Sequence, residues 1–90
     1  MIASRSLDRV GRVVEMLNKE SGHDNVRGME LNLGSLARVA AFVKEFQTRF
    51  KQLDVLLCNA GVTGPFSYTQ TEDGFEETFA TNHLGHMLLT

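Results

Sequence analysis

The sequence predicts an α/β fold with a parallel sheet, and two features of its 90 residues carry this prediction. Short apolar runs of strand length alternate with longer segments in which apolar residues recur every three or four positions. The resulting order of strand, helix, strand, helix, strand, helix is typical of a parallel sheet covered by helices. In addition, the run LDVLLC at residues 53–58 is apolar almost throughout, which is typical of a parallel strand covered on both faces.

The first half of the chain predicts one helix between two short strands. The helix begins after Ser6, a suitable N-cap, and ends at Gly22, a suitable residue just beyond a helix C-terminus. Its apolar stripe consists of Leu7, Val10, Val14 and Leu17. The letters MIAS before it read as the end of a strand, and a second strand is expected within residues 25–33, ending near Asn32.

A second helix is expected after Ser35, which can cap it. Its stripe is the strongest helical pattern in the chain and consists of Val39, Phe42, Val43, Phe46 and Phe50. The apolar run at residues 53–58 follows as a strand. A last helix is expected from Thr69, because Glu72 three residues later completes a capping box.

Composition and charge exclude several classes of function. The formal net charge is −2, which gives no electrostatic footprint for nucleic acid or an anionic membrane. No segment approaches the roughly 18 consecutive apolar residues of a membrane span, and MIASRS lacks the apolar centre of a signal peptide. Cys58 is the single cysteine, so an internal disulfide is excluded and an intracellular location is expected, in the cytoplasm or at the endoplasmic reticulum membrane surface. Its place in an apolar run predicts a small core residue.

Polar residues follow each predicted strand, where ligands bind in open parallel sheets. The three strand ends read Ser4-Arg5, Asn32-Leu33 and Asn59-Ala60-Gly61. Arginine offers a planar charged fork for a phosphate, and the small residues after Asn59 let a flat ligand approach the backbone. Taken singly, an asparagine here is commonly a turn former and an arginine is commonly solvated. Taken together, the three ends favour a nucleotide site.

Two motifs give the chain a family resemblance. CNAGV follows the apolar strand, and DGFEETFATNHLGHMLLT begins about ten residues later. This pair resembles the short-chain dehydrogenase/reductase superfamily, and the wording is most similar to retinol dehydrogenases and related WW-domain oxidoreductases. The resemblance covers essentially the whole chain. It implies a partial Rossmann fold, a doubly wound parallel sheet, with residues 1–90 forming part of an NAD(P)-binding domain from the end of strand 2 to the helix after strand 4.

The resemblance also implies roles at the cofactor. Asn59, Ala60 and Gly61 match the family's N-A-G element beneath the adenine ribose. Arg5 matches the basic residue that favours a 2′-phosphate, so NADP is expected rather than NAD. Asn32 and Leu33 take the place of the usual Asp-Leu or Asp-Val pair beside the adenine. Asparagine departs from that pattern, because its carbonyl can accept a hydrogen bond but carries no charge.

Asn82 matches the asparagine of the family's catalytic tetrad, whose backbone carbonyl holds a water that leads to the active-site lysine. Its position seven residues after Phe75 predicts that it faces the sheet, where an unpaired amide would cost about 1–3 kcal/mol. A satisfied core asparagine that bends the helix is the structural alternative, and the two are compatible. His83 and His86 lack a third ligand at helical spacing, so no metal site is expected.

Several parts of such an enzyme are missing from the sequence, which therefore looks like an internal fragment. The family's T-G-x-x-x-G-x-G turn does not occur, and Tyr68 is followed four residues later by Glu72 rather than by the lysine of Y-x-x-x-K. Strand 1, which lies between strands 2 and 4 in the 3-2-1-4 order, is also missing. We therefore expect residues 53–58 to lack a neighbouring strand.

These observations lead to two hypotheses on function. The first is a fragment of an NADP(H)-dependent oxidoreductase that transfers hydride between nicotinamide and a small-molecule alcohol or carbonyl compound (a retinoid, a steroid or a lipid-like compound), with the 90 residues alone inactive. The second is a truncated, non-catalytic chain that binds a partner through its open strand edges. An independent flavodoxin-type nucleotide module is disfavoured, because no phosphate loop follows any strand. The sequence leaves the oligomeric state of the parent protein open, including a homo-oligomer.

Overall fold

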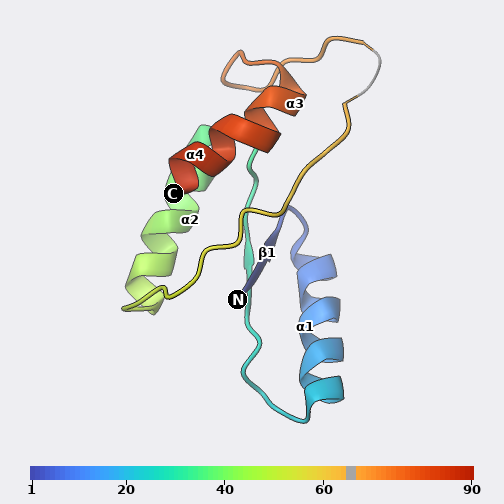
Figure 1. Ribbon diagram of the computed structural model, residues 1–90, viewed down its shortest axis with the longest axis vertical. Coiled ribbons are helices and arrows are strands. Elements are labelled where there is room, and N and C mark those ends of the chain that lie inside the picture. Colours follow the sequence, from blue (N-terminus) through green and yellow to red (C-terminus); the bar gives the residue numbers. More distant parts are fainter. Residues whose placement is uncertain (65–66) are drawn as a thin grey trace. The chain divides into compact units, whose positions relative to one another are not determined.

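The structure is a computed structural model, and it describes residues 1–64 and 67–90. Its elements are β1 (Ile2–Ser4), α1 (Leu7–Ser21), β2 (Gly28–Glu30), α2 (Leu36–Arg49), α3 (Glu77–Phe79), η1 (Ala80–Leu84) and α4 (Gly85–Leu89), where η1 is a π-helix (Figure 1). The α/β prediction is confirmed. The chain divides into two compact units, Met1–Leu31 and Asn32–Thr90.

The first unit is a β-α-β unit with a parallel pair of strands. Ile2 pairs with Gly28, Ala3 with Met29 and Ser4 with Glu30. Helix α1 connects the two strands and packs on them, and its Val10 is buried together with Met29 of β2. Gly28 lets the helix approach closely, because a Cβ at this position would overlap the side chain of Val10.

Local capping determines where α1 begins and ends, as the sequence predicts. The Ser6 hydroxyl accepts a hydrogen bond from the backbone N–H of Arg9 at 3.4 Å. Gly22 ends the helix with a φ of 71°, in the left-handed region that favours glycine.

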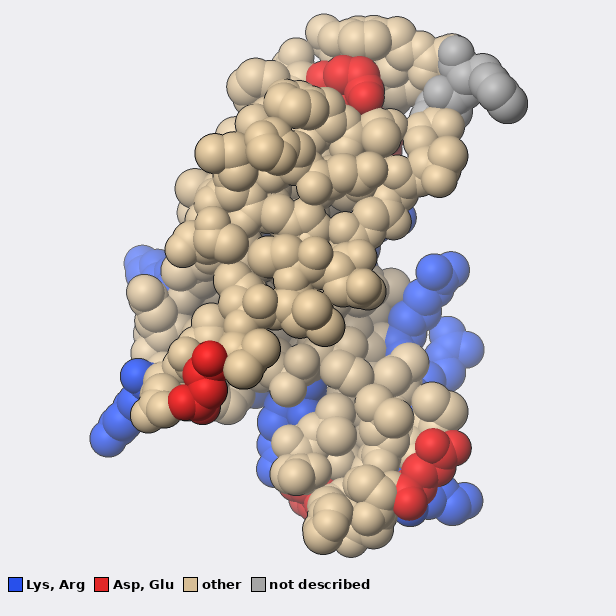
Figure 2. All heavy atoms as spheres, viewed as in Figure 1, with Lys and Arg blue, Asp and Glu red and all other residues tan. Residues whose placement is uncertain are grey.

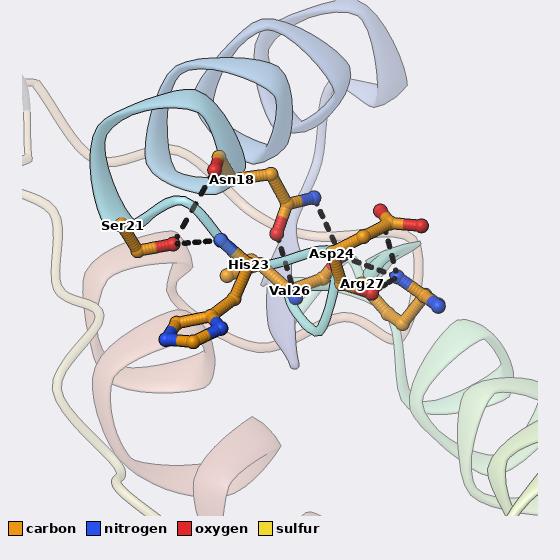
Figure 3. A network of polar contacts seen from close by, with 6 residues as sticks. All are labelled: Asn18, Ser21, His23, Asp24, Val26 and Arg27. Atoms are coloured by element: carbon orange, nitrogen blue, oxygen red, sulfur yellow. Dashed lines mark hydrogen bonds and ion pairs between the residues drawn. The ribbon is translucent and has the colours of Figure 1, made fainter.

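An asparagine side chain fixes the return of the chain toward β2. The Val26 N–H donates to Asn18 Oδ1 at 2.9 Å, and Asn18 Nδ2 donates to the Val26 carbonyl at 3.2 Å (Figure 3). These two bonds pair the side-chain amide with an extended backbone as a neighbouring strand would. Val26 is thereby held two residues before β2 begins.

The second unit contains α2 and the C-terminal helical segment, which lie side by side (Figure 1). Ser35 caps α2 as predicted, with its buried hydroxyl accepting from the Arg38 N–H at 3.3 Å. A second capping bond comes from far along the chain, because Asp73 Oδ2 accepts from the Leu36 N–H at 2.9 Å. Val39 of the predicted stripe is fully buried.

Residues 53–58 form no strand, which corrects one prediction and confirms another. Within the described residues no strand pairs with them, as expected for a segment without a neighbouring strand. The prediction that they form a buried strand is wrong. Val55 and Leu57 are 79% and 82% exposed, and Cys58 is exposed rather than in a core. The physical reason is that an apolar run becomes a buried strand only when other strands and helices cover it.

The last helix begins at Glu77, so the predicted start at Thr69 is wrong. Gly74 has a φ of 81° and lies in a turn closed by a hydrogen bond from its N–H to the Thr71 carbonyl at 3.0 Å. The cap is the Glu76 carboxylate, which accepts from the N–H of Thr78 at 2.6 Å. The Glu76 side chain therefore caps the helix about two turns after the expected cap at Thr69.

Gly85 lies at the contact between the C-terminal helix and the loop before α2. A Cβ at this position would overlap the carbonyl group of Leu33, so only glycine allows the two backbones to approach this closely. The sequence marks Gly85 only as a residue that weakens a helix by about 1 kcal/mol relative to alanine. The structure adds a packing reason for it.

Replacing Gly85 by alanine should therefore lower the stability of the full-length protein. We expect the free energy of unfolding to fall by about 1–3 kcal/mol, because the added methyl group forces Leu33 and α4 apart. The matched control is Gly11→Ala on the open face of α1, where no atom lies within 4 Å of the new Cβ. It should raise the free energy of unfolding by about 1 kcal/mol. Urea denaturation measures both, and equal effects at the two sites would contradict the packing role of Gly85.

Candidate functional site

The candidate site is centred on the segment Asn59–Gly61 and on the helix that holds it. Asn82 pairs with the backbone just after this segment: the Val62 N–H donates to Asn82 Oδ1, and Asn82 Nδ2 donates to the Val62 carbonyl, both at 2.8 Å. The side-chain amide again takes the place of a neighbouring strand. It fixes the chain at the point where the apolar run has ended.

His86 makes a further contact from the same helix. Its Nε2 lies 2.8 Å from the carbonyl oxygen of Ala60. Because a carbonyl oxygen only accepts, this ring nitrogen is the donor. Three hydrogen bonds from two side chains thus hold the backbone of residues 60–62.

A π-turn carries Asn82, and it corrects the expected burial of this residue. The Gly85 N–H donates to the Ala80 carbonyl five residues earlier, which widens the helix at residues 80–84. Asn82 is exposed, and Phe75 and Phe79 are 43% and 52% exposed, so the stripe does not face a sheet. The expected face would need a sheet beneath the helix, and no strand of the described residues lies in this unit. The amide is nevertheless satisfied, and π-bulges of this kind are frequent at functional sites.

The surface of Asn59–Gly61 is open on the side away from these bonds. All three residues are exposed. A Cβ at Gly61 would meet only Asn82, at 3.6 Å from Oδ1. No bulky side chain therefore covers the backbone of Ala60 and Gly61.

Asn32 and Leu33 lie at the start of the second unit, where both are already engaged in structure. Asn32 Oδ1 accepts from the Gly34 N–H at 2.9 Å, which makes a turn before α2. An amide oxygen has a second lone pair, so it can accept another hydrogen bond. The Leu33 side chain is buried, and its backbone carbonyl contacts Gly85.

Arg5 belongs to the first unit and follows β1 directly. Its side chain is exposed, and no hydrogen bond or ion pair engages it among residues 1–64 and 67–90. The neighbouring Ser4 hydroxyl accepts from the Ser6 N–H at 3.5 Å, which shapes the turn into α1. The guanidinium is thus available to an anion.

Charged side chains do not gather into a single patch on the face that Figure 2 draws. Lysine and arginine side chains lie at several separate places among uncharged residues, with acidic groups near some of them (Figure 2). Arg27 and Arg49 pair with Asp24 and Glu45 on their own segments. In the described part of the chain, no helix has both the length and the apolar character needed to cross a membrane.

The parallel β-α-β unit defines the class of protein: a partial Rossmann fold of the doubly wound α/β type. The family model described as short chain dehydrogenase matches residues 1–90, and the chain belongs to this family.

Similar proteins agree with this assignment. The chain is 38% identical over 89 residues to the WW domain-containing oxidoreductase of Gallus gallus, covering 99% of this chain and 21% of that protein. It is 56% identical over 61 residues to retinol dehydrogenase 14 of Mus musculus, covering 68% of this chain and 18% of that protein. It is 37% identical over 90 residues to polyprenol dehydrogenase of Homo sapiens, covering 100% of this chain and 27% of that protein.

A solved structure shows the same fold. The crystal structure of an uncharacterised protein from Mycobacterium paratuberculosis superposes with a TM-score of 0.79 at 34% identity, covering 98% of this chain and 29% of that one. The chain therefore spans about a fifth to a quarter of the length of the relatives named here.

Sequence reasoning missed the contact between His86 and Ala60. A match between two spacings could have indicated it. Asn82 and His86 lie four residues apart on a helix, and their partners Val62 and Ala60 lie two residues apart on the segment that they hold. Both spacings measure about 6 Å along their elements.

Asn82→Ala should loosen the segment after Gly61. The Val62 N–H and carbonyl lose their partners, so its amide should exchange with solvent about fivefold faster and stability should fall by about 1 kcal/mol. The matched control is Asn18→Ala, which removes the equivalent pairing with Val26. It should speed exchange at Val26 and leave Val62 unchanged. Site-resolved hydrogen exchange of the full-length protein measures both, and an unchanged Val62 in the Asn82 variant would refute this role.

Proposed function

We propose that the protein is an NADP(H)-dependent oxidoreductase that transfers hydride between nicotinamide and an alcohol or carbonyl compound. The observation that supports this most is the family match over all 90 residues. The open backbone at Asn59–Gly61 beside Asn82 supports it in geometry. The names of the relatives include an oxidoreductase, a retinol dehydrogenase and a polyprenol dehydrogenase.

The residues present fit a nicotinamide dinucleotide. Ala60 and Gly61 are exposed and carry no bulky side chains. Asn32 retains acceptor capacity for an adenine amino group. Arg5 offers a charged fork for a 2′-phosphate. When bound, the cofactor supplies the hydride chemistry, and these residues bind and orient it.

Asn82 would act in proton handling rather than in cofactor binding. In the family its backbone carbonyl holds a water, and here the Val62 pairing and the π-turn fix where that carbonyl lies. Its side chain is already engaged with Val62, so we propose that only the main chain of Asn82 is available to a water. The substrate we propose is a retinoid, a steroid or a lipid-like alcohol or aldehyde.

One observation favours a second candidate, a non-catalytic chain that binds a partner by adding a strand. Residues 53–58 expose Val55 and Leu57, and no strand pairs with this segment among the described residues. An extended apolar segment with unpaired backbone is able to join the edge of another sheet. Catalysis by the full-length protein would exclude this alternative.

The decisive experiment is an assay of the purified full-length protein with NADPH and NADH against a panel of retinoid, steroid and aliphatic aldehydes. We expect oxidation of NADPH that depends on an aldehyde, with a slower reaction for NADH. Binding of either dinucleotide is measured separately by calorimetry. Absence of both binding and turnover would overturn the proposal.

Arg5→Ala should weaken the preference for NADPH. Loss of a charge-assisted contact to the 2′-phosphate should raise the KM for NADPH about tenfold to a hundredfold and leave the KM for NADH nearly unchanged. The matched control is Arg27→Ala. Arg27 precedes β2 whereas Arg5 follows β1, so in this parallel pair the two arginines mark opposite ends of the strands. Arg27→Ala should change the KM of neither cofactor. An equal rise of the KM for NADPH and for NADH in the Arg5→Ala variant would contradict the assignment.

A further inference from the structure

The hydrogen bond between His86 and Ala60 defines the tautomer of the imidazole. The Ala60 carbonyl accepts, so the proton lies on Nε2. The other ring nitrogen, Nδ1, is buried and has no hydrogen-bond partner among the described residues. Among the described residues, the one hydrogen bond of the ring is therefore its donation to the Ala60 carbonyl.

The register of the helix and of the segment explains how His86 and Asn82 act together. Four residues of helix rise about 6 Å, and two residues of an extended chain rise about 6.6 Å. Asn82 and His86 can therefore hold Val62 and Ala60 at the same time, as the three distances of 2.8 Å show. In the described part of the chain no strand pairs with residues 60–62, so the hydrogen bonds of Asn82 and His86 hold the backbone of these residues.

We propose that His86 is a positioning residue that holds Ala60, and through it Asn59 and Gly61, in the place where the cofactor binds. The imidazole acts through its Nε2–H as the hydrogen-bond donor to the Ala60 carbonyl. Its consequence for the cofactor rests on the proposed function, whereas the hydrogen bond and its effect on residues 60–62 do not.

His83 provides a matched control on the same helix. It is exposed, and its ring contacts Phe79 at a centroid distance of 5.2 Å. It lies three residues before His86, and within the described part of the chain no hydrogen bond joins it to residues 60–62. A phenylalanine at either position keeps a ring and removes the donor, and a glutamine at position 86 keeps a donor.

The first experiment is magnetic resonance of the full-length protein with labelled histidine and backbone. In the wild-type protein we expect His86 to be the Nε2–H tautomer. In the His86→Phe variant we expect the Val62 amide to exchange with solvent about fivefold faster than in the wild type, because loss of the Ala60 contact also loosens the Asn82 pairing. His83→Phe should leave Val62 unchanged, and His86→Gln should restore most of the protection. An Nδ1–H tautomer, or equal exchange in His86→Phe and His83→Phe, would overturn the proposal.

The second experiment separates positioning from general stability. In the active enzyme, His86→Phe should raise the KM for the cofactor about fivefold to tenfold while kcat changes less than threefold, and His86→Gln should recover the wild-type KM. A fall in kcat that tracks the melting temperature would indicate a merely structural role and would overturn the proposal. If the wild-type protein neither binds nor uses a nicotinamide cofactor, the proposed function fails, and the tautomer and exchange measurements still decide the role of His86.

Discussion

Backbone hydrogen bonding is the constraint on which this structure depends. A buried or ordered extended segment needs partners for its N–H and carbonyl groups, and the described residues contain only one pair of three-residue strands. Side chains on helices supply further partners. Asn18 does so for Val26 in the first unit, and Asn82 and His86 do so for residues 60–62 in the second. Each unit therefore uses a helix where a larger sheet would use a strand.

Such pairing requires that the helix be placed accurately, and glycine makes this placement feasible. Gly85 lies between Asn82 and His86, and it contacts the backbone of Leu33 so closely that a methyl group would not fit. The helix is thus fixed on one side against the loop before α2. Because a rigid helix presents residues three and four apart on one face, the position of Gly85 also sets how far Asn82 and His86 reach toward residues 60–62. The packing of Gly85 against Leu33 and the hydrogen bonds of Asn82 and His86 therefore depend on each other.

The features that the sequence predicts correctly are local ones. Ser6, Gly22 and Ser35 act through atoms within four residues of themselves, so their effect can be derived from the order of residues alone. The wrong predictions are of two kinds: the helix start is misplaced because of a local glycine turn, whereas the burial of Asn82 and of residues 53–58 depends on contacts distant in the sequence. The cap at Thr69 is replaced by Glu76 after a glycine turn, and Asn82 is exposed because no sheet of the described residues covers it. The motif alone is enough to select Asn59–Gly61 as a candidate site. Its contact with His86, 26 residues further along the chain, could be found only in the folded structure.

The exposed run before the site shows how these two kinds of contact combine. Val55 and Leu57 are about four-fifths exposed, and burying each side chain would contribute about 1.5–3 kcal/mol. Any strand that covers this run would also give partners to its backbone and would straighten the chain that leads into Asn59. Asn82 and His86 hold the far end of the same chain at residues 60–62. The geometry of Asn59–Gly61 therefore depends on hydrogen bonds within and directly after this segment and on apolar burial before it, and the described residues supply only the hydrogen bonds.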